Sequence, residues 1–207
     1  MYEKESRSRC ILIKESILSD IKETLENLTD VSNEKFTYEF LSKYDSRNFI
    51  LGKYCSCCSH LEGVGKGIME ASILHPDCQN LVIKNIDGKI IAKSTLYVNR
   101  EQGYGVFNNV EINNNIRDEK IKKIIYEKYI EAVDKFAKEY NRRNPNRQLN
   151  QINIGMSLND LSAQIRNENE KSSEILIGLD FSTYEGYPGD WQKEQFIVWK
   201  KENVEKR

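Results

Sequence analysis

Apolar side chains recur at three- and four-residue intervals in the first part of the chain, the spacing of amphipathic helices. This spacing predicts one helix over residues 15–28, with an apolar face of Ile17, Ile21, Leu25 and Leu28. A second helix is predicted over residues 33–44, where Phe36, Phe40 and Tyr44 share a face. We therefore expect a helical N-terminal extension, residues 1–47, that serves packing or partner docking.

The pattern changes in the middle of the chain. The sequence NFILGKY (48–54) predicts a short strand, and EGVGKGIMEASIL (62–74) predicts a helix that ends before His75-Pro76. Alternating apolar and polar residues then predict three strands within residues 80–112. Turn residues at Asp87-Gly88 and at 101–103 join them, so we expect an antiparallel meander.

From about residue 117 onward, the sequence pattern predicts helices that alternate with strands. An apolar stripe from Ile121 to Tyr140 predicts a long helix over about 117–140. A strand at 151–157, a short helix at 158–169 and a last strand at 195–199 follow. The expected fold class is α+β, with residues 48–207 as one domain built on a mixed sheet.

Composition excludes several classes of partner. The chain has 207 residues with 31 basic and 32 acidic side chains, a net charge of −1. Such a balance gives no overall field for nucleic acid or an anionic membrane. No apolar run has the length of a membrane span or a signal peptide. We expect a cytoplasmic protein whose thiols are reduced.

The sequence KYCSCCSH (53–60) concentrates metal-binding side chains. Cys55, Cys58, His60 and Cys78 form a Cys₃His set for zinc, with Cys57 and His75 as alternates. A second interpretation is a group of buried thiols, since free cysteine packs as a small apolar side chain. A third is a reactive thiol whose pKa is lowered at the start of a helix.

The order of elements resembles the GNAT superfamily of N-acetyltransferases over roughly residues 48–200. Three segments carry the resemblance locally: NVEI (109–112), NIGMSLNDLSA (153–163) and IGLDF (177–181). The meander also resembles GNAT-like proteins of phages and mobile elements. The resemblance implies that the strands at 106–112 and 151–156 run parallel and then diverge, with acyl-CoA, expected to be acetyl-CoA, entering between them.

The resemblance also implies which residues hold the cofactor. Pantetheine would lie along the two strands, and pyrophosphate at the start of the long helix. The implied contacts are Val110, Ile112, Asn113, Arg117, Asn153, Gly155 and Asn159. The chain departs from the family pattern at the helix start, where Lys120 and Lys122 replace two small residues. Lysine crowds the backbone there but binds phosphate as a point charge.

Acyl transfer to an amine needs a base for the ammonium proton and an acid for the leaving thiolate. The resemblance places Glu111 as the base, and apolar neighbours are expected to raise its pKa. An exposed Glu111 without a catalytic role is the alternative. Tyr184 and Tyr187 are the nearest candidates for the acid. The expected acceptor is an amine on a small molecule or a protein. The rival function is a non-catalytic GNAT-like module that docks on a host macromolecule.

Overall fold

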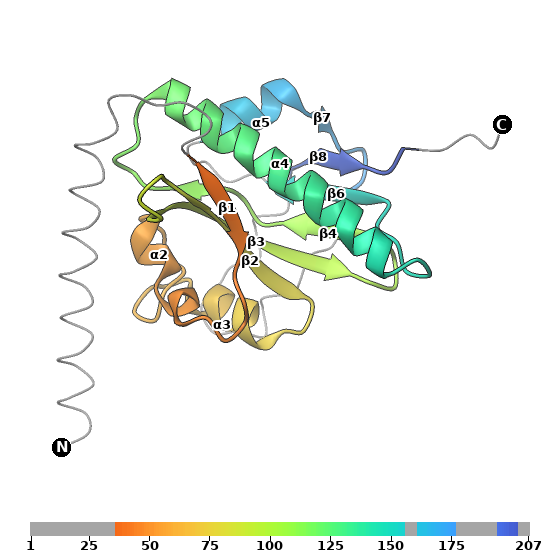
Figure 1. Ribbon diagram of the computed structural model, residues 1–207, viewed down its shortest axis with the longest axis horizontal. Coiled ribbons are helices and arrows are strands. Elements are labelled where there is room, and N and C mark those ends of the chain that lie inside the picture. Colours follow the sequence, from red (N-terminus) through yellow and green to blue (C-terminus); the bar gives the residue numbers. More distant parts are fainter. Residues whose placement is uncertain (1–35, 156–160, 177–193, 203–207) are drawn as a thin grey trace, which may run out of the picture.

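The computed structural model describes residues 36–155, 161–176 and 194–202 (Figure 1). The predicted helix over 15–28 therefore lies outside the described residues. The elements, in chain order, are β1 (Thr37–Phe40), η2 (Ser46–Phe49), α2 (Leu51–Tyr54), α3 (Lys66–Leu74), β2 (Cys78–Lys84), β3 (Ile90–Asn99), β4 (Tyr104–Phe107), β5 (Glu111–Ile112), α4 (Glu119–Arg143), β6 (Gln151–Gly155), α5 (Ser162–Glu168), β7 (Glu170–Lys171) and β8 (Gln195–Lys200).

The strands form one mixed sheet in the order β1-β2-β3-β4-β6-β8-β7, with β5 paired beside β3. Among the described strands, β4 and β6 pair in parallel and the other pairs are antiparallel. The long helix α4 connects the meander to β6, as the parallel pairing requires a crossover. These features confirm the predicted α+β fold class, the meander and the long helix.

Two expectations for the N-terminal part of the domain are wrong. The helix predicted over 33–44 does not form in its described part, residues 36–44, because Thr37–Phe40 pairs with β2 as strand β1. Threonine and aromatic residues favour a pleated, half-buried surface, so this short segment suits a strand. Residues 48–54 do not form a strand. Asp45 accepts a hydrogen bond from the Arg47 amide at 2.9 Å and starts a 3-10 turn, which α2 follows.

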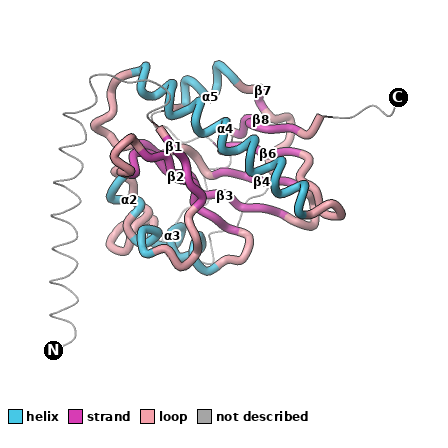
Figure 2. Tube along the Cα trace, viewed as in Figure 1, coloured by secondary structure: helices cyan, strands magenta, loops and turns pink. Residues whose placement is uncertain are grey.

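The sheet separates two layers of helices (Figure 2). Leu81 and Ile83 belong to the main core with α4, whereas Val82 packs with Leu51 of α2. Successive strand residues point to opposite faces, so α4 covers one face and α2 covers the other. On the α2 face, α3 packs through Ile68 and Ala71 against Tyr104 and Val106 of β4. None of the described helices is long and apolar enough to cross a membrane.

Candidate active site

The strands β4 and β6 pair over a short length and then part. Their parallel register runs from Tyr104 opposite Gln151 to Phe107 opposite Ile154. Beyond Phe107, the chain leaves β6 and rejoins β3 as β5, with Glu111 opposite Lys93. On the other side, Gly155 continues along β8. The structure therefore brings the two predicted strands together as parallel neighbours whose pairing ends part-way.

Asn108 is the residue at which the first strand turns away. Its backbone N–H donates to the Thr95 carbonyl at 3.0 Å, and its side-chain Oδ1 accepts from the Thr95 N–H at 2.8 Å. The side chain thus takes an acceptor position that a backbone carbonyl would fill in a regular ladder. Residues 108–110, between β4 and β5, lie opposite only Ser94 and Thr95 of β3, so one extra residue is inserted, as in a β-bulge.

Glu111 lies on the α2 face of the sheet, where its carboxylate meets a buried lysine. Oε2 of Glu111 lies 3.2 Å from Nζ of Lys93, and the two side chains are 12% and 2% exposed. Burial alone would raise the pKa of Glu111. The ammonium of Lys93 and hydrogen bonds from Cys57, Lys93 and Asn109 outweigh burial, so the pKa is lowered. The expectation of a raised pKa is wrong because it took no account of this cation.

Lys93 is the cation that the sequence analysis missed. Burial lowers its pKa, but the neighbouring acidic groups Cys57, Glu111 and Cys55 more than reverse this, so the pKa lies above that of an ordinary lysine. The alternation in KIIAKSTLYVN puts Lys93 on the same face as Thr95 and Tyr97. That polar face is typical of a solvated strand. Here α2 and the loop after it cover the face, a contact between distant segments.

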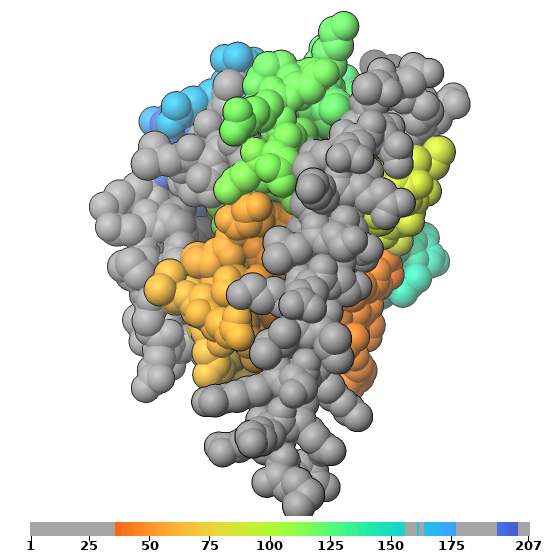
Figure 3. Space-filling view, turned by 90° about the vertical axis from the view of Figure 1, so that its left-hand side faces the viewer, coloured from red at the N-terminus to blue at the C-terminus, as the bar shows by residue number. Residues whose placement is uncertain are grey.

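The loop that follows α2 is held against the segment before α4. Asn113 Nδ2 donates to the Tyr54 carbonyl at 2.8 Å, and the Asn114 N–H donates to Ser56 Oγ at 3.5 Å. Figure 3 shows these parts of the chain, green and orange, next to one another on this face. Ser56 has a φ of 53°, so the loop turns sharply at its first residues. The Cys-rich loop therefore forms one wall beside Glu111.

Two thiols of this loop, those of Cys55 and Cys57, are not activated by a helix start. Burial is the main cause that raises the pKa of both Cys55 and Cys57. The helix α3 begins only at Lys66, so its N-terminus does not act on these two thiols. For Cys55, which is buried, and Cys57, which is partly buried, the structure therefore favours the interpretation as packed thiols over the reactive one.

The four predicted zinc ligands are not brought together. Cys55 belongs to the core cluster that includes Val82 of β2, whereas Cys78 lies four residues before Val82, about 13 Å from it along the strand. Zinc–sulfur bonds are about 2.3 Å long, so these two sulfurs are not placed to share a metal ion. In the described ranges, His, Cys, Asp and Glu side chains form no group of three or more that could hold one.

The start of α4 is capped by an acidic residue. Asp118 is the N-cap, and its Oδ1 accepts from the Lys120 N–H at 2.7 Å. Glu119 follows in the first turn and pairs with Lys122 at 2.8 Å. Arg117 is exposed beside them. The predicted pyrophosphate site therefore offers basic side chains, while one helix amide is already satisfied by a carboxylate.

The other predicted cofactor residues lie in different surroundings. Val110 and Ile112 are buried in the main core with α4. Asn153 is buried, and its Nδ2 donates to Ser172 Oγ at 3.0 Å and to Gln195 Oε1 at 2.9 Å. The side-chain amide of Asn153 is thus occupied, and its backbone lies in β6 between Val106 of β4 and Ile197 of β8. Gly155 ends β6. The predictions for Asn159, Tyr184 and Tyr187 lie outside the described residues.

No protein-family model and no curated protein matches this sequence. Solved acetyltransferase structures are similar to it. A GNAT-family acetyltransferase from Staphylococcus aureus is 15% identical, with 78% of this chain and 97% of that chain covered and a TM-score of 0.48. A spermidine N-acetyltransferase chimera from Vibrio cholerae and hSSAT is 12% identical, with 79% of this chain and 94% of that chain covered and a TM-score of 0.47.

The ribosomal-protein-S18-alanine N-acetyltransferase of Escherichia coli is 10% identical, with 78% of this chain and 90% of that chain covered and a TM-score of 0.45. At these identities and TM-scores the likeness assigns this chain neither a function nor a role for any residue. The sheet order, the parallel β4–β6 pair and the crossover helix α4 give this chain a GNAT-like α+β fold.

Proposed function

We propose that the protein binds an acyl-CoA, acetyl-CoA in the simplest case, and transfers the acyl group to an amine. The observation that carries this proposal is the parting of β4 and β6 after Phe107 and Ile154. Strands that separate within a sheet offer backbone N–H and C=O groups to an extended chain such as pantetheine. The amides and carbonyls of Val110 and Gly155 flank this point.

Charged side chains, more than helix amides, would hold the phosphates. Asp118 already accepts from the Lys120 N–H, and its negative charge opposes a phosphate at the same helix end. Arg117 and Lys120 are both exposed there. Lysine and arginine bind phosphate through charge and hydrogen bonds without the close backbone approach that glycine allows. We assign the pyrophosphate contacts to these two residues.

Glu111 is the proposed acceptor of the amine proton. Its lowered pKa keeps it ionised near neutral pH. The amine nitrogen would form a bond to the thioester carbonyl carbon, the carbon–sulfur bond would break, and Glu111 would take the proton that the amine loses. Tyr184 or Tyr187 would return a proton to the leaving thiolate, which remains a prediction. Lys93 holds the Glu111 carboxylate in place.

The test is release of free CoA thiol from acetyl-CoA in the presence of a panel of polyamines and peptides with free amino groups. The proposal expects release that depends on both protein and amine. If the protein binds acetyl-CoA but releases no thiol with any amine, the proposed acyl transfer is refuted and the proposed cofactor site is not.

The second candidate is a non-catalytic module that docks on a host macromolecule. The acidic cap of α4 favours it, because Asp118 and Glu119 stand where a phosphate would bind. In that case the protein would bind no acyl-CoA at all. The likeness to phage and mobile-element proteins belongs to this candidate and stays a prediction.

A further inference from the structure

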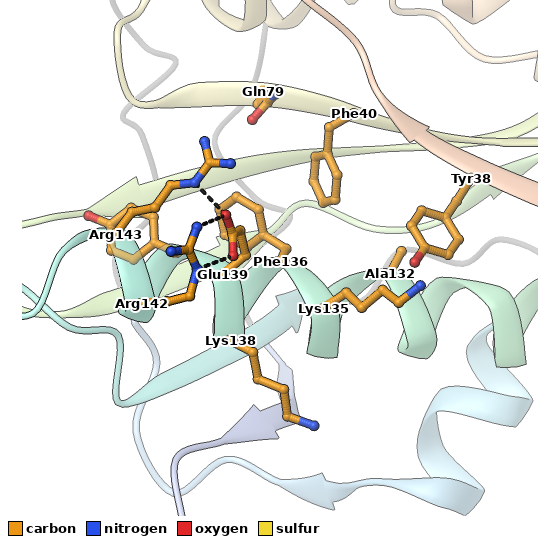
Figure 4. A pocket seen from close by; sticks show the side chains of 11 residues that line it. Tyr38, Phe40, Gln79, Ala132, Lys135, Phe136, Lys138, Glu139, Arg142 and Arg143 are labelled. Atoms are coloured by element: carbon orange, nitrogen blue, oxygen red, sulfur yellow. Dashed lines mark hydrogen bonds and ion pairs between the residues drawn. The ribbon is translucent and has the colours of Figure 1, made fainter.

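A groove lies between β1 and the C-terminal half of α4, away from the parting of β4 and β6. Figure 4 shows its lining, with Tyr38 and Phe40 from β1 facing residues 132–143 of α4. Its volume is about 690 Å³. In the sheet order, β1 is an end strand, so α4 and β1 meet at the border of the sheet.

The floor of the groove is aromatic. The rings of Phe40 and Phe136 lie 5.0 Å apart, and those of Phe136 and Tyr140 lie 5.9 Å apart. These side chains pack against the main core but are only partly buried. Aromatic faces left in contact with water gain stability from a further apolar partner. The floor therefore suits the apolar side of an amphipathic segment.

The rim of the groove is basic. Four of its charged lining residues are cationic and one is anionic, which gives a lining charge of +3: Lys135, Lys138, Arg142, Arg143 and Glu139. Hydrogen bonds from Arg142 and Arg143 lower the pKa of Glu139 to about 2, so this carboxylate is occupied by the two guanidinium groups (Figure 4). Lys135 and Lys138 are exposed, with acidic partners on their own helix.

We propose that residues 15–28 of the same chain dock in this groove. The segment carries apolar side chains at helical spacing, from Ile17 to Leu28, that match an aromatic floor. It has four acidic residues and one basic residue, a net charge of −3: Glu15, Asp20, Glu23, Glu26 and Lys22. Apolar and charge patterns of the segment are thus both complementary to the groove.

Length and connection also fit. A helix over 15–28 would be about 21 Å long, and the α4 residues from Ala132 to Arg143 that line the groove span about 18 Å. The segment joins β1 through residues 29–36, and eight residues reach at most about 29 Å. Because β1 lines the groove and the connection to β1 is short, residues 15–28 can reach the groove.

Hydrogen exchange on the full chain tests the proposal. An isolated helix of 14 residues is marginal in water, so slow exchange of amides 15–28 would report docking. We expect them to exchange about tenfold or more slowly than in a synthetic peptide of the same residues, a difference of about 1.4 kcal/mol. The double variant K135E/K138E should lose this protection, because it reverses the charge that the acidic segment would meet. Both side chains are exposed, so we expect the fold to be retained.

Two further variants make the comparison specific. K123E/K201E makes the same charge change at exposed lysines outside the groove and should leave protection intact. Adding E23K/E26K to K135E/K138E should restore part of the protection. Peptide-like exchange in the unaltered chain would overturn the proposal, as would equal protection in K135E/K138E. Protection that disappears on dilution would assign the groove to a second copy and would also overturn it.

Discussion

At the residue scale, the buried pair Lys93–Glu111 decides what the site can do. A buried ion pair is weak evidence for stability, but removing one partner leaves an uncompensated charge in the interior. The sequence predicted Glu111 on the fourth strand, from strand patterning and the local NVEI segment, whereas the structure ends β4 at Phe107 and puts Glu111 at the start of β5. The sequence could not place Lys93 beside Glu111, because the pairing of β5 with β3 and the cover from α2 depend on non-local contacts.

Glu111→Gln should separate stability from catalysis. The change leaves Lys93 buried without a counter-charge, so we expect the free energy of unfolding to fall by about 3 kcal/mol. Acyl transfer should fall by roughly 10²–10⁴-fold, the usual effect of losing a general base. Urea unfolding and a thiol-release assay measure the two effects.

The matched control is the double variant K93M/E111Q, which removes both charges. It should recover most of the lost stability but none of the activity. Recovered activity in this variant would contradict the role of Glu111 as the base.

Cys78 gives a prediction at alkaline pH. Burial raises its pKa from the ordinary value of 9.0 to about 12; the Asp77 carboxylate adds to the rise and Lys43 opposes it. The unfolded thiol therefore loses its proton above pH 9, while the folded thiol keeps it until about pH 12. Stability from this group is full below pH 9 and should fall by up to about 1.4 kcal/mol per pH unit as pH rises through this window.

Cys78→Ala should reduce that slope. Urea unfolding at pH 8, 9, 10 and 11 measures it, and a residual slope from Cys55 and Cys57 is expected because their pKa values are also raised. Identical slopes in the two proteins would show that Cys78 titrates normally in the folded state.

At the element scale, long segments with a clear period were predictable and short ones were not. The meander, α3 and α4 follow the hydrophobic pattern closely. The segments at 37–40 and 48–54 are too short for a period to be decisive. Pairing with β2 made the first a strand, and the Asp45 turn followed by packing of Leu51 made the second helical.

The two turns of the meander should differ in their tolerance of substitution. Gly88 and Gly103 have φ angles of 77° and 71°, which a side chain disfavours. A Cβ at Gly88 meets nothing within 4 Å, whereas at Gly103 it would lie 2.7 Å from the Gln148 carbonyl oxygen. Gly88→Ala should destabilise the fold by about 1 kcal/mol, and Gly103→Ala by clearly more. Thermal unfolding ranks them, and an equal loss would contradict the steric argument.

The cap of α4 offers a test of the phosphate end of the site. Asp118→Ser keeps a side-chain acceptor for the Lys120 N–H but removes the negative charge. If CoA phosphates bind at this helix end, acetyl-CoA affinity should increase roughly two- to fivefold, the effect of about 0.3–1 kcal/mol. Titration calorimetry of the variant measures the change. Unaltered affinity would place the phosphates elsewhere.

At the scale of the whole molecule, the fold places two regions of different character at separate positions along one sheet. The parting of β4 and β6 lies in the middle of the strand order, next to the buried Lys93–Glu111 pair. The aromatic, basic groove lies at the β1 end. The resemblance to the GNAT superfamily, which rests mainly on the order of elements, predicted the parting of β4 and β6. The second region could not be predicted, because it depends on β1, which the sequence pattern assigned to a helix.

Calorimetric titration of the purified protein with acetyl-CoA tests the central claim most directly. Binding between β4 and β6 predicts saturable heat with one molecule of acetyl-CoA per chain. It also predicts weaker binding when Arg117 and Lys120 are both replaced by alanine, because these residues are assigned to the phosphates. No detectable heat at high acetyl-CoA concentration would contradict the account and leave the fold as that of a module without an acyl-CoA site.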